Sequence, residues 1–102
     1  MTKKQLICNY NYKEGIIKVK DDFIYLTETD NKLLKILLDN YNKIVKPEKI
    51  CKKVYADEID DVYRATIRTA ISRLRIKIKS IAEIHCKQRF GYRLEMKRVN
   101  KR

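Results

Sequence analysis

The chain has 102 residues, 25 of them Lys or Arg and 13 Asp or Glu, for a formal net charge of +12 at pH 7. Its length suits one compact domain, and a hydrophobic content of 44 % excludes an intrinsically disordered chain. The sequence has no apolar run near the roughly 18 residues of a membrane span and no signal peptide. We therefore expect a soluble, cytoplasmic protein.

The first part of the chain predicts a small antiparallel meander behind a short tail, residues 1–5. Apolar, β-branched and aromatic residues recur in short runs, which polar turns around Gly15 and Asp21 separate. The expected strands lie at residues 6–8, 10–12, 16–19 and 23–26.

Two helices are expected next. Thr27 and Asp30 form an approximate capping box, and the leucines that follow recur at helical spacing until about residues 40–42. Pro47 suits the first position of a second, shorter helix that ends near Tyr55. The acidic stretch that follows predicts a loop, at about residues 56–61.

A third helix, from about residue 61 to 80, has the strongest periodicity in the chain. Its apolar residues are spaced i, i+4, i+7 and i+11 and fall within about 60° of one another on a helix. We expect them to form one buried stripe, consisting of Ile67, Ile71, Leu74 and Ile78.

The opposite face of this helix combines small, hydroxylated and basic residues and has no acidic residue after Asp61. Its centre consists of Ala65, Thr69, Ser72, Arg73 and Ile76, and its edges of Arg64, Thr66, Arg68, Arg75 and Lys79. Such a face can approach another surface closely. The major groove of DNA is about 12 Å wide and admits one helix, so we predict that this face binds DNA.

After this helix, residues 84–88 and 92–96 predict a β-hairpin whose turn needs the positive φ that Gly91 allows. The basic residues Lys87, Arg89 and Arg93 lie near the turn. Residues 97–102 are expected to be a frayed basic tail.

The charge is concentrated in the C-terminal part of the chain. Residues 1–60 carry a net charge of +2, whereas residues 61–102 carry +10 and hold all eight arginines. Arginine binds phosphate and guanine in a bidentate manner, whereas lysine also serves as a general solubilising charge. The alternative, a solvated basic face, explains the lysines but not the segregation of the arginines. The C-terminal part is therefore predicted to bind a polyanion.

The cysteines and the histidine give no sign of a metal site or of catalysis. Cys8, Cys51 and Cys86 have neither disulfide-framework nor zinc-ligand spacing, and each is expected to be a small buried residue. His85 adjoins Cys86, but neighbours on a strand point to opposite faces, which argues against a nucleophile and base. With no carboxylate pair or phosphate loop in the sequence, we predict neither an enzyme nor a cofactor.

The order of the elements describes an α+β winged helix-turn-helix over residues 6–96, with an N-terminal antiparallel meander, three helices and a C-terminal hairpin. Four motifs stand in this order: L-T-x-x-D with L-L at residues 26–34, I-V with E-K-I at 44–50, I-S-R-L-R-I-K at 71–77 and F-G-Y-R-L at 90–94. Together they resemble the DNA-binding effector domain of OmpR/PhoB-type response regulators.

The resemblance implies a transcriptional regulator that binds double-stranded DNA sequence-specifically. The third helix would enter the major groove, and the hairpin, residues 84–96, would lie as a wing on the flanking minor groove. Arg73 would read a base, while Thr66, Arg75 and Tyr92 would contact phosphates. The wing tip would present Gln88 and Arg89 to the minor groove.

Four positions depart from the family pattern: Lys46, Ala65, Cys86 and Arg89. Because of these departures, the resemblance predicts neither the wing contacts nor the preferred DNA sequence. Alternatives also stand for individual residues. Arg75 and Arg93 could pair with Glu83, Glu95 or the acidic loop instead of DNA, and Tyr92 could be chiefly a packing residue.

The family also implies protein partners. The loop at 56–61, with Asp57, Glu58 and Asp60, corresponds to a segment that faces RNA polymerase, and members bind direct repeats as head-to-tail dimers. The phosphorylatable receiver domain of two-component phosphorelays is not in this sequence, so the chain is either an excised effector domain or a free-standing regulator.

Two other functions remain open from the sequence. A basic RNA- or ribosome-associated protein would need exposed aromatics for base stacking, but most of the seven tyrosines precede the arginine-rich segment. A winged-helix module that binds an acidic protein is the second alternative.

Overall fold

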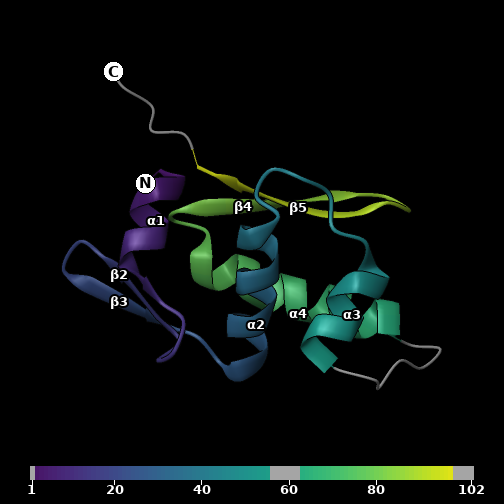
Figure 1. Cartoon of the computed structure of the whole chain (residues 1–102), viewed down its shortest axis with the longest axis horizontal. Coiled ribbons are helices and arrows are strands. Elements are labelled where there is room, and N and C mark those ends of the chain that lie inside the picture. The colour runs from purple at the N-terminus through teal and green to yellow at the C-terminus, as the bar shows by residue number, and fades with distance from the viewer. Residues whose placement is uncertain (1, 56–62, 98–102) are drawn as a thin grey trace.

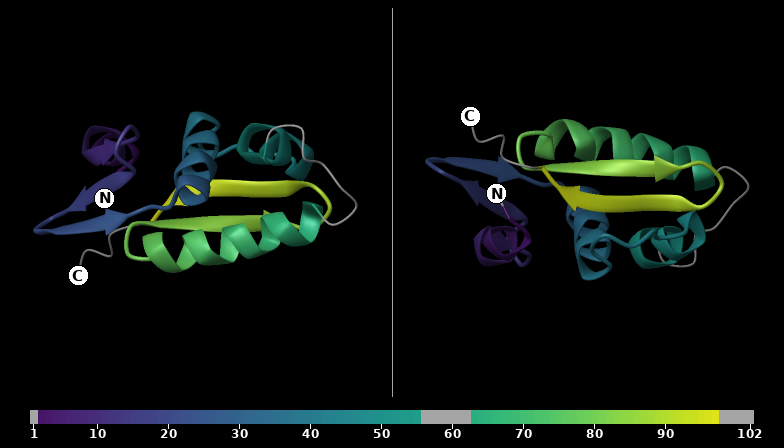
Figure 2. Two further views of the ribbon diagram at one scale, coloured as in Figure 1. Left: turned by 90° about the horizontal axis from the view of Figure 1, so that it is seen from below. Right: turned by 90° about the horizontal axis from the view of Figure 1, so that it is seen from above.

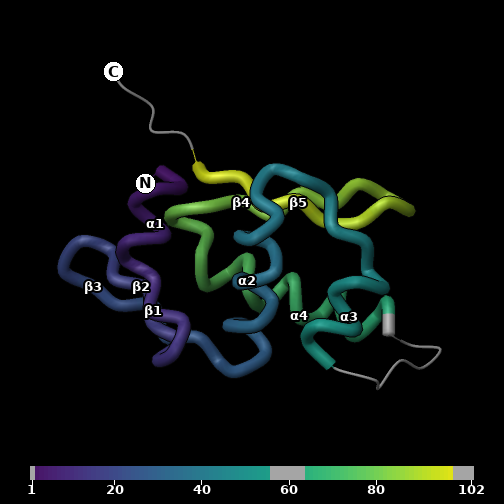
Figure 3. Tube along the Cα trace, in the orientation of Figure 1, coloured from purple at the N-terminus to yellow at the C-terminus, as the bar shows by residue number. Residues whose placement is uncertain are grey.

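The computed structural model describes residues 2–55 and 63–97, which form four helices and two antiparallel sheets. The elements are α1 (Lys3–Asn9), β1 (Tyr10–Asn11), β2 (Ile16–Val19), β3 (Asp22–Tyr25), α2 (Glu28–Asp39), α3 (Pro47–Tyr55), α4 (Tyr63–Ile78), β4 (Ala82–Lys87) and β5 (Gly91–Met96). The three-stranded sheet and α1 lie at one end, and the hairpin tip lies at the other (Figures 1 and 3). The predicted α+β winged-helix class is confirmed, with one helix more than expected.

The additional helix is at the N-terminus, where the expected tail and first strand are wrong. Thr2 Oγ1 accepts a hydrogen bond from Gln5 N at 3.2 Å, and Thr2 N donates to Gln5 Oε1 at 2.7 Å. This capping box starts α1 at Lys3, and Leu6 is the one buried residue that the helix contributes to the core. Three apolar residues in a row, 6–8, suggested a strand, but the helix buries only the first of them.

The remaining helices follow the predicted boundaries closely. Both α2 and α3 match their expected ranges, and α4 lies within the expected 61–80. The predicted stripe on α4 is confirmed, because its four residues are at most 1 % exposed; they are Ile67, Ile71, Leu74 and Ile78.

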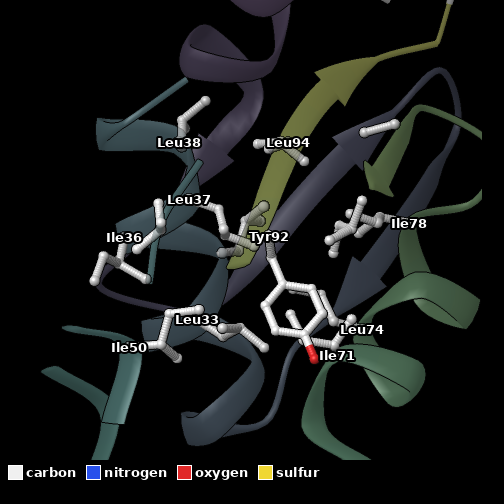
Figure 4. Packing of buried hydrophobic residues seen from close by; sticks show 14 of the residues in the cluster. Leu33, Ile36, Leu37, Leu38, Ile50, Ile71, Leu74, Ile78, Tyr92 and Leu94 are labelled. Carbon is white, nitrogen blue, oxygen red and sulfur yellow. The ribbon is translucent and has the colours of Figure 1, made fainter. Parts of the chain in front are cut away.

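The β4–β5 hairpin lies across the helices, with α4 along one side and α2 and α3 along the other (Figure 2). Figure 4 shows the core between these layers, where Leu33 and Leu37 of α2 approach Leu74 of α4 and Leu94 of β5. The core therefore fixes α4 against both the hairpin and α2. The expected burial of the cysteines is right for Cys51, but Cys8 on α1 and Cys86 near the hairpin tip lie outside this core and are exposed.

Among the described residues, Asp30 is the one buried residue with a charged side chain, and it is 3 % exposed. Its Oδ2 accepts a hydrogen bond from Thr27 N at 3.1 Å and another from Lys77 Nζ. Burial disfavours the charged carboxylate, but these hydrogen bonds outweigh it and lower the pKa of Asp30 below 3.8. The pair ties the N-terminus of α2 to the last turns of α4.

Replacing Asp30 with Asn is expected to lower the free energy of unfolding by about 1–3 kcal/mol at pH 7, because the variant loses the buried ion pair and weakens the helix cap. The folded-state pKa is depressed, so the wild type has this stabilisation above about pH 4 and loses it as the pH falls. Urea denaturation between about pH 2 and 7 should therefore show a shallower acid dependence for Asp30→Asn.

The matched control is Asp39→Asn, which removes an exposed pair with Lys35 at 2.7 Å. We expect a loss of less than about 0.5 kcal/mol there. Equal losses for the two variants would contradict a special role of the buried pair.

Gly91 holds the hairpin close to the segment before α3. Tyr92 and Val45 exchange backbone hydrogen bonds of 2.7 and 3.0 Å, and a Cβ on Gly91 would lie 2.1 Å from Val45 O. The predicted positive φ is confirmed at +143°, and Arg89, at +71°, supplies the left-handed residue of the turn itself. Only glycine fits between these two backbones.

Gly91→Ala is expected to destabilise the fold by about 2–4 kcal/mol, since one of the two backbones must move. Gly15→Ala is the control, because its Cβ would meet Leu26 O at 3.2 Å and its φ is +66°; we expect a loss of about 1 kcal/mol there. Thermal and urea unfolding of both variants would test this, and an unaffected Gly91→Ala protein would disprove it.

Candidate nucleic-acid interface

The face of α4 opposite the buried stripe is exposed throughout. Each residue that the sequence assigned to its centre or edges is exposed; these are Arg64, Ala65, Thr66, Arg68, Thr69, Ser72, Arg73, Arg75, Ile76 and, just after the helix, Lys79. No residue of α4 is acidic. The face is therefore positively charged and open to a ligand.

A helix groove of about 700 Å³ runs along one side of this face. It lies between α4 and the ends of two other helices, and its walls include Thr27, Thr29, Tyr55, Thr66, Thr69, Arg73 and Ile76. The Asp30–Lys77 ion pair also lines the groove, and the threonines, Tyr55 and Arg73 supply its other hydrogen-bonding groups.

A wing cleft of about 120 Å³ lies on the other side of the face, between α4 and the hairpin. It is lined by Pro47, Arg64, Arg68, Cys86, Lys87, Gln88, Arg89, Gly91 and Tyr92. Four of these residues are basic and none is acidic, so the cleft suits an anion. Residues from α4 and from the wing, far apart in the sequence, meet in this cleft.

Tyr92 lies both in the core and at the wing cleft. It is 8 % exposed, and its ring packs beside Ile71 and Leu74 (Figure 4). Burial raises the pKa of its hydroxyl above 10.0, with Cys86 adding to the rise and Arg68 and Arg75 opposing it. Tyr92 is thus a packing residue whose protonated hydroxyl borders the wing cleft.

Arg75 and Arg93 have partners within the protein. Arg75 donates two hydrogen bonds to Ile84 O, from Nε at 3.0 Å and Nη2 at 2.8 Å, so it holds β4 against α4. Arg93 pairs with Glu95 at 2.6 Å, as the alternative prediction had it, and also donates to Asn42 at 2.6 Å. The guanidinium of Arg75 therefore serves the protein's own backbone.

Arg64 Nη2 lies 3.0 Å from Glu48 Oε1, a pair that joins α4 to α3. Both side chains are about half exposed, at 54 % and 49 %. An exposed pair of this kind stabilises a protein by about 1 kcal/mol or less, so a phosphate can replace the carboxylate as the partner of Arg64.

The sequence did not single out Tyr55 as part of this surface. Tyr55 lines the helix groove opposite α4. Burial raises the pKa of its hydroxyl above 10.0, with Cys51 adding to the rise and Arg73 opposing it. Its position in the groove depends on how α3 packs against α4, which no pattern along the chain gives.

Two sequence predictions lie outside the described residues. These are the polymerase-facing loop with Asp57, Glu58 and Asp60, and the end of the basic tail, residues 98–102. No helix in the part of the chain that the structure describes is long and apolar enough to cross a membrane.

Residues 21–94 match the family model described as "Transcriptional regulatory protein, C terminal". The chain belongs to this family, the OmpR/PhoB-type effector domains. The domain therefore binds DNA sequence-specifically as a transcriptional regulator, and its family consists of regulatory rather than catalytic domains. No curated protein matches it at a significant level.

Solved structures with the same fold include several DNA-binding domains. The C-terminal domain of NsrR, a lantibiotic response regulator for nisin resistance, is 30 % identical with a TM-score of 0.67, over 80 % of this chain and 85 % of that one. The DNA-binding domain of Bacillus subtilis CssR is 22 % identical with a TM-score of 0.70, over 78 % and 90 %. That of Klebsiella pneumoniae RstA, solved with the RstA box, is 22 % identical with a TM-score of 0.63, over 76 % and 80 %.

Arg75→Ala is expected to loosen the hairpin of this effector domain, because Ile84 O loses both hydrogen bonds. If amide exchange occurs through local opening, a loss of about 1.4 kcal/mol in the free energy of opening the hairpin makes exchange in β4 and β5 about tenfold faster. Arg68→Ala is the control, since Arg68 faces the wing cleft, and its exchange rates should equal those of the wild type. A DNA-binding defect of Arg75→Ala with unchanged exchange would instead indicate a direct phosphate contact.

Proposed function

We propose that α4 inserts into the major groove of double-stranded DNA while the β4–β5 wing lies against the adjoining minor groove. The exposed face of α4 carries this proposal, because it combines small residues, hydroxyls and arginines without an acidic side chain. One helix of this width fits a major groove, and the positive charge supplies affinity for the phosphate backbone.

The two sides of α4 suit different contacts. Arg73, at the centre of the face, is placed to read a base, with Thr69 and Ser72 beside it. On the wing side, phosphates would be held by basic groups and the Tyr92 hydroxyl, with Gln88 and Arg89 at the minor groove; the basic groups are Arg64, Arg68, Lys79 and Lys87. On the opposite side, Thr66 and Tyr55 can donate hydrogen bonds to the other strand.

Arg75 is assigned a different role from the one the resemblance implied. Its guanidinium donates two hydrogen bonds to Ile84 O. We therefore propose that Arg75 positions the wing and that any contact it makes with a phosphate is secondary.

The proposed setting is that of a two-component response regulator. The domain would act in the cytoplasm, bind direct repeats as a head-to-tail dimer, and contact RNA polymerase through the acidic loop that holds Asp57, Glu58 and Asp60. The family membership supports this assignment, and the NsrR domain it resembles belongs to a response regulator.

Arg73→Ala is expected to reduce affinity for a selected duplex by about 1–3 kcal/mol, or roughly 5- to 150-fold, while binding to unrelated duplexes changes little. The reason is that a base contact contributes to sequence discrimination, whereas phosphate contacts are common to all sequences. The measurement is a gel-shift or anisotropy titration of duplexes obtained by in-vitro selection with the wild-type domain.

Arg68→Ala is the matched control, because it removes an equal charge at the wing cleft. It should weaken binding to all duplexes alike and reduce the slope of log K against log salt by about 1. Equal affinity of the wild type for duplex DNA, single strands and structured RNA would favour the RNA-binding alternative. Selective binding with no loss in Arg73→Ala would disprove the base-reading role.

A further inference from the structure

Ile76 is the most exposed of the large hydrophobic side chains in the described chain, at 71 %. It follows Arg73 by three residues and Thr69 by seven, and all three line the helix groove. Residues at these spacings share one face of a helix. A large apolar side chain therefore lies beside the proposed base-reading arginine, on a face otherwise made of small, hydroxylated and basic residues.

The fold itself does not use Ile76. The apolar stripe of α4 is complete without it, since its four members are at most 1 % exposed. A single exposed apolar residue is common on protein surfaces and by itself indicates nothing. The position of Ile76 distinguishes it, because the face that carries it is the one proposed to be covered by DNA.

Two polar groups near Ile76 are engaged within the protein. Thr69 Oγ1 donates to Ala65 O at 3.2 Å, and Lys77 Nζ donates to Asp30. Arg73 and Ile76 are the two large, exposed side chains that α4 contributes to the helix groove, one polar and one apolar.

We propose that Ile76 reads the 5-methyl group of a thymine next to the base contacted by Arg73; this rests on the proposed insertion of α4 into the major groove. Thymine is the base that presents a methyl group in that groove, and guanine is the preferred partner of arginine. Three residues of helix rise about 4.5 Å, against about 3.4 Å per base pair, so the thymine lies one or two base pairs from the guanine.

Replacing thymine by deoxyuridine tests this directly, since it deletes only the methyl group. In a duplex selected by the wild-type domain, each thymine near the guanine is replaced in turn and the Kd is measured. We expect one replacement to weaken wild-type binding about three- to fivefold, the effect of losing one buried methyl contact. Ile76→Ala should bind the thymine site correspondingly more weakly and be insensitive to that replacement, while Ile76→Val keeps part of the sensitivity.

The matched control is Ile7→Ala, which changes an exposed isoleucine on α1, 54 % exposed and remote from α4. It should retain the wild-type response to deoxyuridine. If the wild type and Ile76→Ala respond equally, while both still depend on Arg73 for a selected site, the inference is overturned and the DNA-binding proposal stands. If the wild type selects no duplex sequence, the proposed function itself fails, and this inference with it.

Discussion

The structure depends on α4 serving two surfaces at once. Its 16 residues divide into a fully buried apolar stripe and an exposed basic face, so the rotation of the helix decides which groups meet a ligand. Contacts on its two flanks fix that rotation: Lys77 reaches the buried carboxylate of Asp30 at the start of α2, and Arg75 reaches the backbone of β4 at Ile84. The helix is thereby held to both layers of the domain.

The wing depends on the same arrangement. Arg75 fixes one strand of the hairpin to α4, and the bridge between Val45 and Tyr92 fixes the other strand to the segment before α3. Gly91 lets these backbones approach near the turn end of the hairpin, and Arg89, with φ of +71°, turns the chain at the tip. Two separate contacts thus set the width of the cleft that lies between helix and wing.

Much of this could be predicted from the sequence where the signal was local. Pro47 marked the start of α3, and the period of Ile67, Ile71, Leu74 and Ile78 defined both faces of α4. At the N-terminus, two local signals conflicted, and the capping box of Thr2 overrode the apolar run that follows it. The role of Arg75 and the placement of Tyr55 depend on tertiary contacts, which no spacing along the chain contains.

The internal pairing of the cations changes what a polyanion would meet. The segment 61–102 holds 13 Lys and Arg residues, but Lys77 is matched by Asp30 and Arg93 by Glu95. Only cations that neutralise phosphates displace condensed counterions, and each such phosphate contributes about −0.9 to the slope of log K against log salt concentration. The affinity for DNA should therefore fall less steeply with salt concentration than the composition suggests. Weaker electrostatic binding means weaker sequence-independent binding, so base contacts contribute a larger share of the affinity.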